Sequence, residues 1–199
     1  MSSTAYHTAL TTSRDNPAEG EPKAVHYGSL TTALVHDLTT GLHPKTFALG
    51  RVIYGEPPFH PGWSEFHRRA GIEPRLSYAD FMRLLDAEAV RAVGQGVDTY
   101  WLVSHKVAAR HLTSSGAAVP VRINGGSAVM ACYGPPLSGN LPDAEDVIRF
   151  LAGKYQSVAD PACGFGRAGR IFAEVGKSSF LTDISPICIG HIAAQPWAQ

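Results

Sequence analysis

With 199 residues, of which 44% are hydrophobic and 17% charged, the chain is long enough to bury a core and too short for two full domains. Its 17 basic and 17 acidic residues cancel, so the overall charge does not indicate a nucleic-acid binder, which usually carries a basic face. The three cysteines, Cys132, Cys163 and Cys188, are an odd number without metal-ligand spacing, which predicts free thiols and no metal site. Because no apolar run is long enough to cross a membrane and no signal-peptide pattern is visible, we expect a cytoplasmic protein without membrane contact.

The first segment, residues 1–26, is rich in Ser, Thr, Pro and charge, which predicts a disordered tail ahead of a single domain at 27–199. In that domain, apolar runs predict seven strands, at 32–37, 51–55, 99–104, 119–123, 127–133, 157–160 and 179–183. Helical spacing and end signals predict helices at 78–93, 107–113, 142–153 and 168–175.

The order of these segments predicts the fold class. Strands separated by helices favour a mainly parallel sheet. The turn signal Asn124-Gly125-Gly126 joins the strands at 119–123 and 127–133 into an antiparallel hairpin, and Pro120 puts the first arm at a sheet edge or makes it begin late. We therefore expect an α/β fold whose mainly parallel sheet contains one antiparallel hairpin.

The most informative stretch is Asp-Pro-Ala-Cys-Gly-Phe-Gly at 160–166, between a predicted strand and a predicted helix. A carboxylate at a strand end, followed by two glycines and a helix start, makes a socket where the backbone can approach a ligand closely. The acid favours a cationic or amine-bearing ligand over a bare phosphate. A tight strand-to-helix turn without a ligand is the alternative interpretation.

This stretch resembles the cofactor loop of S-adenosylmethionine-dependent N-methyltransferases, whose usual form is Asp-Pro-Phe-x-Gly-x-Gly. The segment Lys-Ser-Ser-Phe-Leu-Thr-Asp-Ile-Ser-Pro at 177–186 is similar to the second cofactor strand of that family. The resemblance implies that Asp160 and the loop backbone hold the methionine part of the cofactor, and that Asp183 accepts hydrogen bonds from the ribose hydroxyls. It implies a cofactor site made of Asp160, Ala162, Cys163, Gly164, Gly166, Asp183, Ile184 and, near the adenine, Asp37.

A second motif, Glu56-Pro57-Pro58-Phe59, resembles the catalytic tetrapeptide of amino-methyltransferases, in which an Asp, Asn or Ser precedes Pro-Pro and an aromatic residue. The resemblance implies that the side-chain oxygen and the Pro57 carbonyl accept the protons of a base amine, which then attacks the cofactor methyl group. Phe59 would stack on a base extruded from the duplex. Glutamate departs from the family by one methylene group, and a Pro-Pro loop after a strand is the alternative.

The motif order is permuted, because the catalytic-type motif and the hairpin precede the cofactor loop. This order resembles one class of DNA amino-methyltransferases of the N6-adenine or N4-cytosine type, over roughly residues 30–192. The resemblance implies a seven-stranded Rossmann-like sheet with circularly permuted strand order, and methylation of an adenine or cytosine amino group in the DNA of a phage or bacterium. Three alternatives stay open: a silent cofactor-fold subunit that needs a partner, a related enzyme making a different base or amine modification, and a dinucleotide-dependent oxidoreductase suggested by the spacing Gly164-x-Gly166-x-x-Gly169.

Possible DNA contacts follow the catalytic-type motif, where basic residues are interleaved with an aromatic side chain: Arg68, Arg69, Arg75 and Trp63. Such a mixture suits a phosphate backbone and splayed bases, although a solvated helix face with buried aromatics has the same pattern. Family members with strict target sites carry a recognition region between the hairpin and the cofactor loop, where this chain has only Gly134 to Tyr155. The resemblance therefore implies low sequence selectivity or a partner recognition subunit, with a homodimer as another arrangement.

Overall fold

The computed structural model describes residues 24–123 and 126–199. Most of the tail expected at 1–26 lies outside these ranges. Its last three residues instead begin strand β1 (Ala24–Tyr27), which pairs antiparallel with β2 (Thr31–Val35). The described structure therefore includes residues 24–26, which the composition had assigned to the tail.

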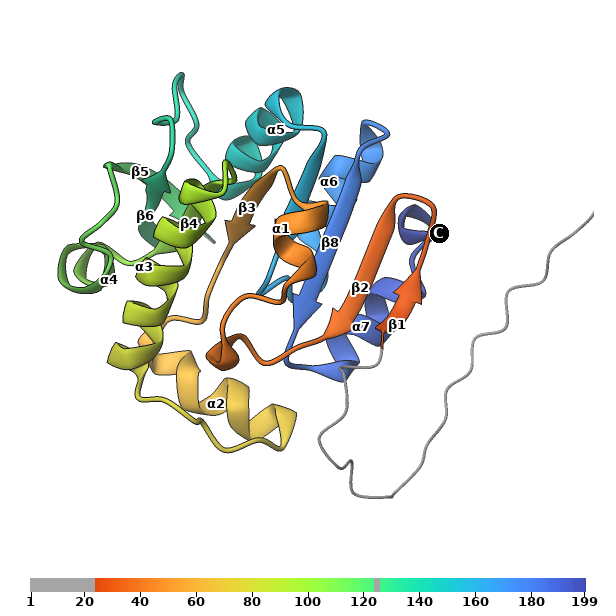
Figure 1. Cartoon of the computed structure of the whole chain (residues 1–199), viewed down its shortest axis with the longest axis horizontal. Helices are drawn as coiled ribbons and strands as arrows, with labels where there is room; N and C mark the ends of the chain where they lie inside the picture. The colour runs from red at the N-terminus through yellow and green to blue at the C-terminus, as the bar shows by residue number, and fades with distance from the viewer. Residues whose placement is uncertain (1–23, 124–125) are drawn as a thin grey trace, which may run out of the picture.

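Eight strands form one sheet in the order β1-β2-β8-β7-β3-β4-β6-β5 (Figure 1). The other six are β3 (Val52–Gly55), β4 (Asp98–Val103), β5 (Ala117–Ile123), β6 (Gly126–Tyr133), β7 (Ser157–Asp160) and β8 (Ser178–Asp183). Strands β2, β8, β7, β3 and β4 are parallel, whereas β6 runs antiparallel to both β4 and β5. The seven predicted strands and the hairpin are confirmed, and β1 is an additional strand at one edge. Pro120 lies in β5 at the opposite edge, where a missing N–H is tolerated.

Helices cover both faces of the sheet. One face carries α1 (Lys45–Leu49), α3 (Tyr78–Gly94) and α4 (His105–His111), and the other carries α5 (Ala144–Lys154), α6 (Arg167–Glu174) and α7 (Pro186–Ala193). Helix α2 (His60–Ala70) lies across the end of the sheet at which β2 and β8 finish (Figure 1). Two short 3-10 helices, Leu38–Thr40 and Pro196–Ala198, complete the described elements.

Local sequence explains most helix ends. The side chain of Ser77 caps α3 by accepting the N–H of Asp80, and Asp143 caps α5 in the same way. Gly153, expected to stop α5, lies inside its last turn, because the helix continues to Lys154. The sequence did not predict α1, α2 or α7, which are short or begin with proline and glycine. Proline is tolerated in a first turn, where its missing N–H has no helical partner.

Candidate active site at the carboxyl edge of the sheet

Four acidic residues lie at one edge of the sheet because four neighbouring parallel strands end there. In the spatial order β2, β8, β7, β3 these residues are Asp37, Asp183, Asp160 and Glu56. The chain leaves β7 into α6 on one face and leaves β3 toward α2 and α3 on the other, so the strand order reverses between β7 and β3. Ligands of open α/β sheets bind at such a switch point.

The two central acids are buried and lack a cationic partner. Asp160 is 4% exposed and Asp183 is 3% exposed, and neither forms an ion pair with any described residue. Burial, followed by the nearby Glu56 carboxylate, holds the pKa of Asp160 well above its usual range, although the Ala162 N–H opposes this shift. Burial also raises the pKa of Asp183. A cation entering here would relieve both carboxylates.

Asp183 organises the loop after β7. Its Oδ2 accepts the Gly164 N–H at 2.9 Å and its Oδ1 accepts the Ser185 N–H at 2.8 Å. These bonds tie the end of β8 to the loop 161–166 and to the start of α7. Each carboxylate oxygen keeps a second lone pair for a ligand hydroxyl.

The two glycines of this loop have different surroundings. Gly164 has φ of +50° and no atom within 4 Å of the place where a Cβ would lie, so open space faces its backbone. Gly166 has φ of +82° and begins α6, and a Cβ there would lie 2.8 Å from Trp197 and 3.0 Å from Ile192. Gly164 leaves room for a ligand, whereas Gly166 lets the helix start close to the C-terminal segment. Cys163, just before them, is buried beneath the loop.

This difference predicts the effect of alanine at two left-handed glycines. Gly176, which follows α6, has φ of +68° and no crowding atom, so it is the matched control. Gly176→Ala should lose about 1–2 kcal/mol of unfolding free energy through backbone strain alone. Gly166→Ala should lose a further 1–3 kcal/mol or so, because Trp197 must move. Urea denaturation measures both, and equal losses would contradict the packing role.

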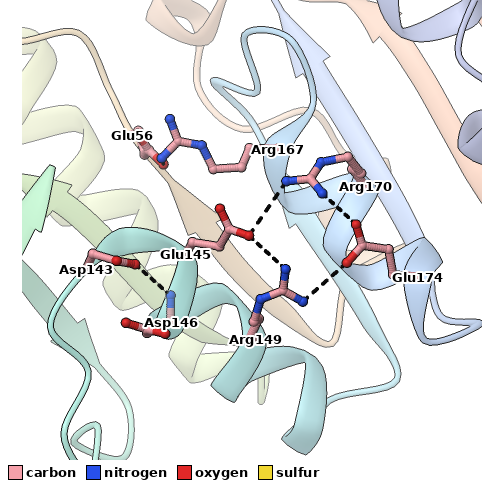
Figure 2. A network of polar contacts seen from close by, with 8 residues as sticks. All are labelled: Glu56, Asp143, Glu145, Asp146, Arg149, Arg167, Arg170 and Glu174. Carbon is pink, nitrogen blue, oxygen red and sulfur yellow. Dashed lines mark hydrogen bonds and ion pairs between the residues drawn. The ribbon is translucent and has the colours of Figure 1, made fainter. Parts of the chain in front are cut away.

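Glu56 lies on the other side of the switch point. Its Oε1 accepts the Tyr54 hydroxyl at 2.6 Å. The same oxygen lies 3.5 Å from the guanidinium of Arg167 in α6, and Figure 2 shows these two side chains next to each other. Burial, followed by the Glu56 charge, raises the pKa of Tyr54 well above its usual range, so this hydroxyl stays a donor. The contact with Arg167 therefore joins the catalytic-type motif to the first residue of α6. Helix α6 follows the cofactor-type loop directly.

Figure 2 shows that further ion pairs join α5 to α6 beside this contact. Arg149 bridges Glu145 at 2.7 Å and Glu174 at 3.2 Å, and Arg170 contacts the same two acids. These side chains are about half exposed, and such surface pairs contribute roughly 0–1 kcal/mol each. The network therefore orients α6 more than it stabilises the domain.

A hollow opens beside Asp37 and Asp183, and its empty space amounts to about 370 Å³ when the part open to solvent is included. Five residues predicted for the site line it: Asp37, Pro58, Ala162, Asp183 and Ile184. Glu56, Pro57, Phe59, Asp160, Cys163, Gly164 and Gly166 do not line the hollow and lie in the motifs next to it. The remaining walls are His36, Leu38, Thr39, Trp63, Phe66, His67, Phe81 and Pro161.

The aromatic wall comes from residues that sequence reasoning did not assign to a site, or assigned elsewhere. Trp63, expected to contact DNA, is 7% exposed and stacks on Phe81 with ring centroids 4.4 Å apart. Because Phe81 of α3 covers much of the ring, the low exposure of Trp63 gives no support to the expected DNA contact. His67, one helical turn later, is also buried, and the sequence did not assign it to a site. The spacing of Trp63 and His67 at i, i+4 was the signal that both lie on one inward face.

Two of the three arginines expected beside DNA have partners within the protein. Arg68 pairs with Glu65 at 2.7 Å, and Arg75 lies 3.8 Å from Asp37. The side chain of Arg69 lies outside the described part. Within residues 24–123 and 126–199, no group of three or more His, Cys, Asp or Glu is placed to bind a metal. Over the same ranges, no helix combines the length and apolarity needed to cross a bilayer.

Comparison with solved structures shows the fold of the DNA methyltransferases. The chain is similar to PvuII DNA methyltransferase (cytosine-N4-specific), with a TM-score of 0.54 and 10% identity over 87% of this chain and 88% of that one. It is also similar to TTHA0409, a putative DNA modification methylase from Thermus thermophilus, with a TM-score of 0.51 and 12% identity over 82% and 92% of the two chains. No protein-family model and no curated protein matches the sequence. The predicted permuted methyltransferase sheet is confirmed, and so is the resemblance to the N6-adenine and N4-cytosine methyltransferases in structure.

Proposed function

Starting from the methyltransferase fold, we propose that this protein transfers a methyl group from S-adenosylmethionine to an exocyclic amino group of adenine or cytosine in DNA. One observation carries the proposal. Two buried acids that form no ion pair with the described residues, Asp160 and Asp183, lie at the switch point beside a Pro-Pro motif. This is the electrostatic environment that a sulfonium or ammonium group requires.

The described residues fit the cofactor. Asp160 would face its cationic methionine part, and the open space at Gly164 lets the backbone approach. Asp183 has lone pairs left for ribose hydroxyls, while Asp37, Ala162 and Ile184 line the hollow offered to the adenosine part. Cys163 is the buried residue of the loop, and Gly166 lets the loop pack closely against Trp197 and Ile192. S-adenosylmethionine supplies an electrophilic methyl carbon.

The catalytic-type motif supplies acceptors for the protons of a target amine. Glu56 presents a carboxylate and Pro57 a backbone carbonyl, and the two prolines stiffen the segment. As the amine becomes cationic during attack, hydrogen bonds to these oxygens strengthen, which is the condition for lowering the barrier. Phe59, half-buried at the start of α2, is the candidate for stacking on the target base.

Binding to DNA is expected to be weak for the isolated chain and steeply dependent on salt. The formal net charge is zero, and Arg68 and Arg75 are already paired with acids. A partner recognition subunit or a homodimer would supply the missing contacts, in the cytoplasm of a bacterium or a phage-infected cell.

A second candidate function is a cofactor-binding subunit that needs a partner for turnover. It is favoured by the contacts of Glu56, whose Oε1 is already held by Tyr54 and Arg167. In this case the carboxylate would stabilise α6 rather than accept a proton from a base.

Mass spectrometry of plasmid nucleosides after expression of the full chain tests the proposal. We expect N6-methyladenine or N4-methylcytosine, with an unmodified control from cells expressing Glu56→Ala. Calorimetry with S-adenosylmethionine accompanies this measurement. Binding without any methylated base would favour the silent subunit. Tight binding of NAD without binding of S-adenosylmethionine would reject the proposal and support a dinucleotide enzyme.

A further inference from the structure

His67 of α2 has a ring whose proton position follows from its contacts. Its Nδ1 lies 3.0 Å from the backbone oxygen of Trp63. A carbonyl oxygen can only accept, so Nδ1 carries the hydrogen, and in the neutral ring Nε2 is a bare acceptor. Because Nδ1 faces its own helix, Nε2 points away from it, and His67 forms part of the wall of the hollow.

Nε2 is buried and has no hydrogen-bond partner among the described residues. Only two other buried side-chain atoms of the described part share this condition, and they belong to Thr46 and Thr182, neither of which lines the hollow. A buried polar atom without a hydrogen-bond partner is energetically unfavourable, and folded proteins usually avoid one. The structure therefore keeps an unused, buried acceptor on a residue that lines the hollow.

The other polar side chains of the wall are already engaged. His36 Nε2 contacts the backbone oxygen of Gly41 at 2.8 Å. Asp37 accepts the N–H and hydroxyl of Thr39 through one oxygen and lies near Arg75 through the other. Asp183 holds two backbone N–H groups. Among the side chains of the wall, His67 is the one with a buried acceptor atom that has no hydrogen-bond partner in the described part.

The position of the imidazole is held firmly. The Trp63 ring lies edge-on to it with centroids 4.2 Å apart, and Trp63 in turn stacks on Phe81. A fixed acceptor in a hollow with aromatic walls suits a flat ring that carries an N–H donor at its edge.

We propose that His67 Nε2 accepts a hydrogen bond from the exocyclic amine of an adenine bound in the hollow, and thereby selects adenine over hypoxanthine. Hypoxanthine presents an oxygen at the same ring position, which would oppose the acceptor. The inference rests on the proposed function and deepens it. The adenine belongs to the cofactor, because the same walls contain Asp183 and Ile184 at the end of the second cofactor-type strand.

Calorimetry with two free ligands tests this selection: S-adenosylhomocysteine and its counterpart with hypoxanthine in place of adenine. The full chain should bind the adenine ligand at least about tenfold more tightly, as expected when a buried polar group is left unpaired by the wrong ligand. His67→Phe keeps a flat ring without an acceptor and should bring the affinity ratio close to one. His105→Phe, a change at an exposed histidine of α4, should leave the ratio unchanged.

The outcomes distinguish a failure of the proposed role of His67 from a failure of the methyltransferase proposal. Equal binding of both ligands by the unmodified chain overturns the role of His67 and leaves the methyltransferase proposal standing. Binding of neither ligand overturns the methyltransferase proposal itself. If His67→Phe does not fold, the two ligands are compared on His67→Gln, where a retained preference with reduced affinity supports the inference and an unchanged affinity contradicts it. If His67→Phe instead alters only the preference for the target base in oligonucleotides, the assignment to the cofactor's adenine is wrong.

Discussion

Asp160→Asn is expected to weaken binding of S-adenosylmethionine by about ten- to a hundredfold and, at the same time, to raise the melting temperature of the ligand-free protein. The weaker binding follows from loss of a charge-assisted interaction worth roughly 1.5–3 kcal/mol. The gain in stability follows because burial and Glu56 disfavour the Asp160 carboxylate, whereas an amide is neutral and still accepts the Ala162 N–H. Calorimetry and thermal denaturation measure the two effects.

The gain in melting temperature of Asp160→Asn over the parent should increase as the pH rises. The pKa of Asp160 in the folded protein lies well above its ordinary value, so between the two values the folded state holds a proton that the unfolded chain has released. The stability of the parent therefore falls as pH rises through this window, and the asparagine variant lacks that fall. We expect little difference near pH 4 and a rise of at least about 2 °C at pH 8, since 1 kcal/mol corresponds to about 2–4 °C for a domain of this size.

Asp143→Asn is the matched control, because Asp143 is an exposed acid whose capping role asparagine also performs. It should change neither cofactor affinity nor the pH dependence of melting. Equal melting temperatures of Asp160→Asn and the parent at every pH would show that Asp160 is not strained in the ligand-free protein.

Glu56→Ala is expected to bind S-adenosylmethionine normally and to lose at least about a hundredfold in methylation rate, the range typical of a lost polar catalytic group. The reason is that the acceptor acts mainly as the amine becomes cationic, so its removal affects the chemical step more than binding. Glu56→Asp should retain activity or gain it, because it restores the usual family residue. Single-turnover methylation of DNA and calorimetry separate the two steps.

Glu174→Ala provides the comparison, because it also removes a carboxylate that pairs with arginines of the α5–α6 network, at the far end of α6 (Figure 2). It should leave the methylation rate nearly unchanged. A Glu56→Ala variant that methylates DNA as fast as the parent would mean that this motif is not the catalytic one. An equal loss in both variants would assign the effect to the orientation of α6.

Short-range sequence patterns predicted the elements on which the site is built. The strands that end at Gly55, Asp160 and Asp183 are short, and each contains adjacent apolar residues: Val-Ile-Tyr, Val-Ala and Phe-Leu. Their ends could be expected to meet, because parallel strands finish at one edge of a sheet. The glycine spacing likewise marked the loop at 161–166, since the left-handed conformation of Gly164 and Gly166 is open to few other residues.

Contacts between distant segments could not be read in the same way. Trp63 carried the pattern of a base-stacking residue, and it is the packing of Phe81 from another helix that buries it. Arg167 meets Glu56 across 111 positions of the chain, so the engagement of the proposed catalytic carboxylate had no local signal.

The sequence by itself determined the strands, the order of the motifs and the acids at the sheet edge, because these depend on local periodicity and on chain direction. The tertiary structure alone decided that Glu56 lies beside Arg167 and that Asp160 is buried without an ion pair to the described residues. It also decided that His67 has a buried acceptor without a partner in the described part. Burial and charge compensation arise from groups that the fold brings together. They set the pKa of Asp160, and the same packing leaves His67 Nε2 without a hydrogen-bond partner in the described part.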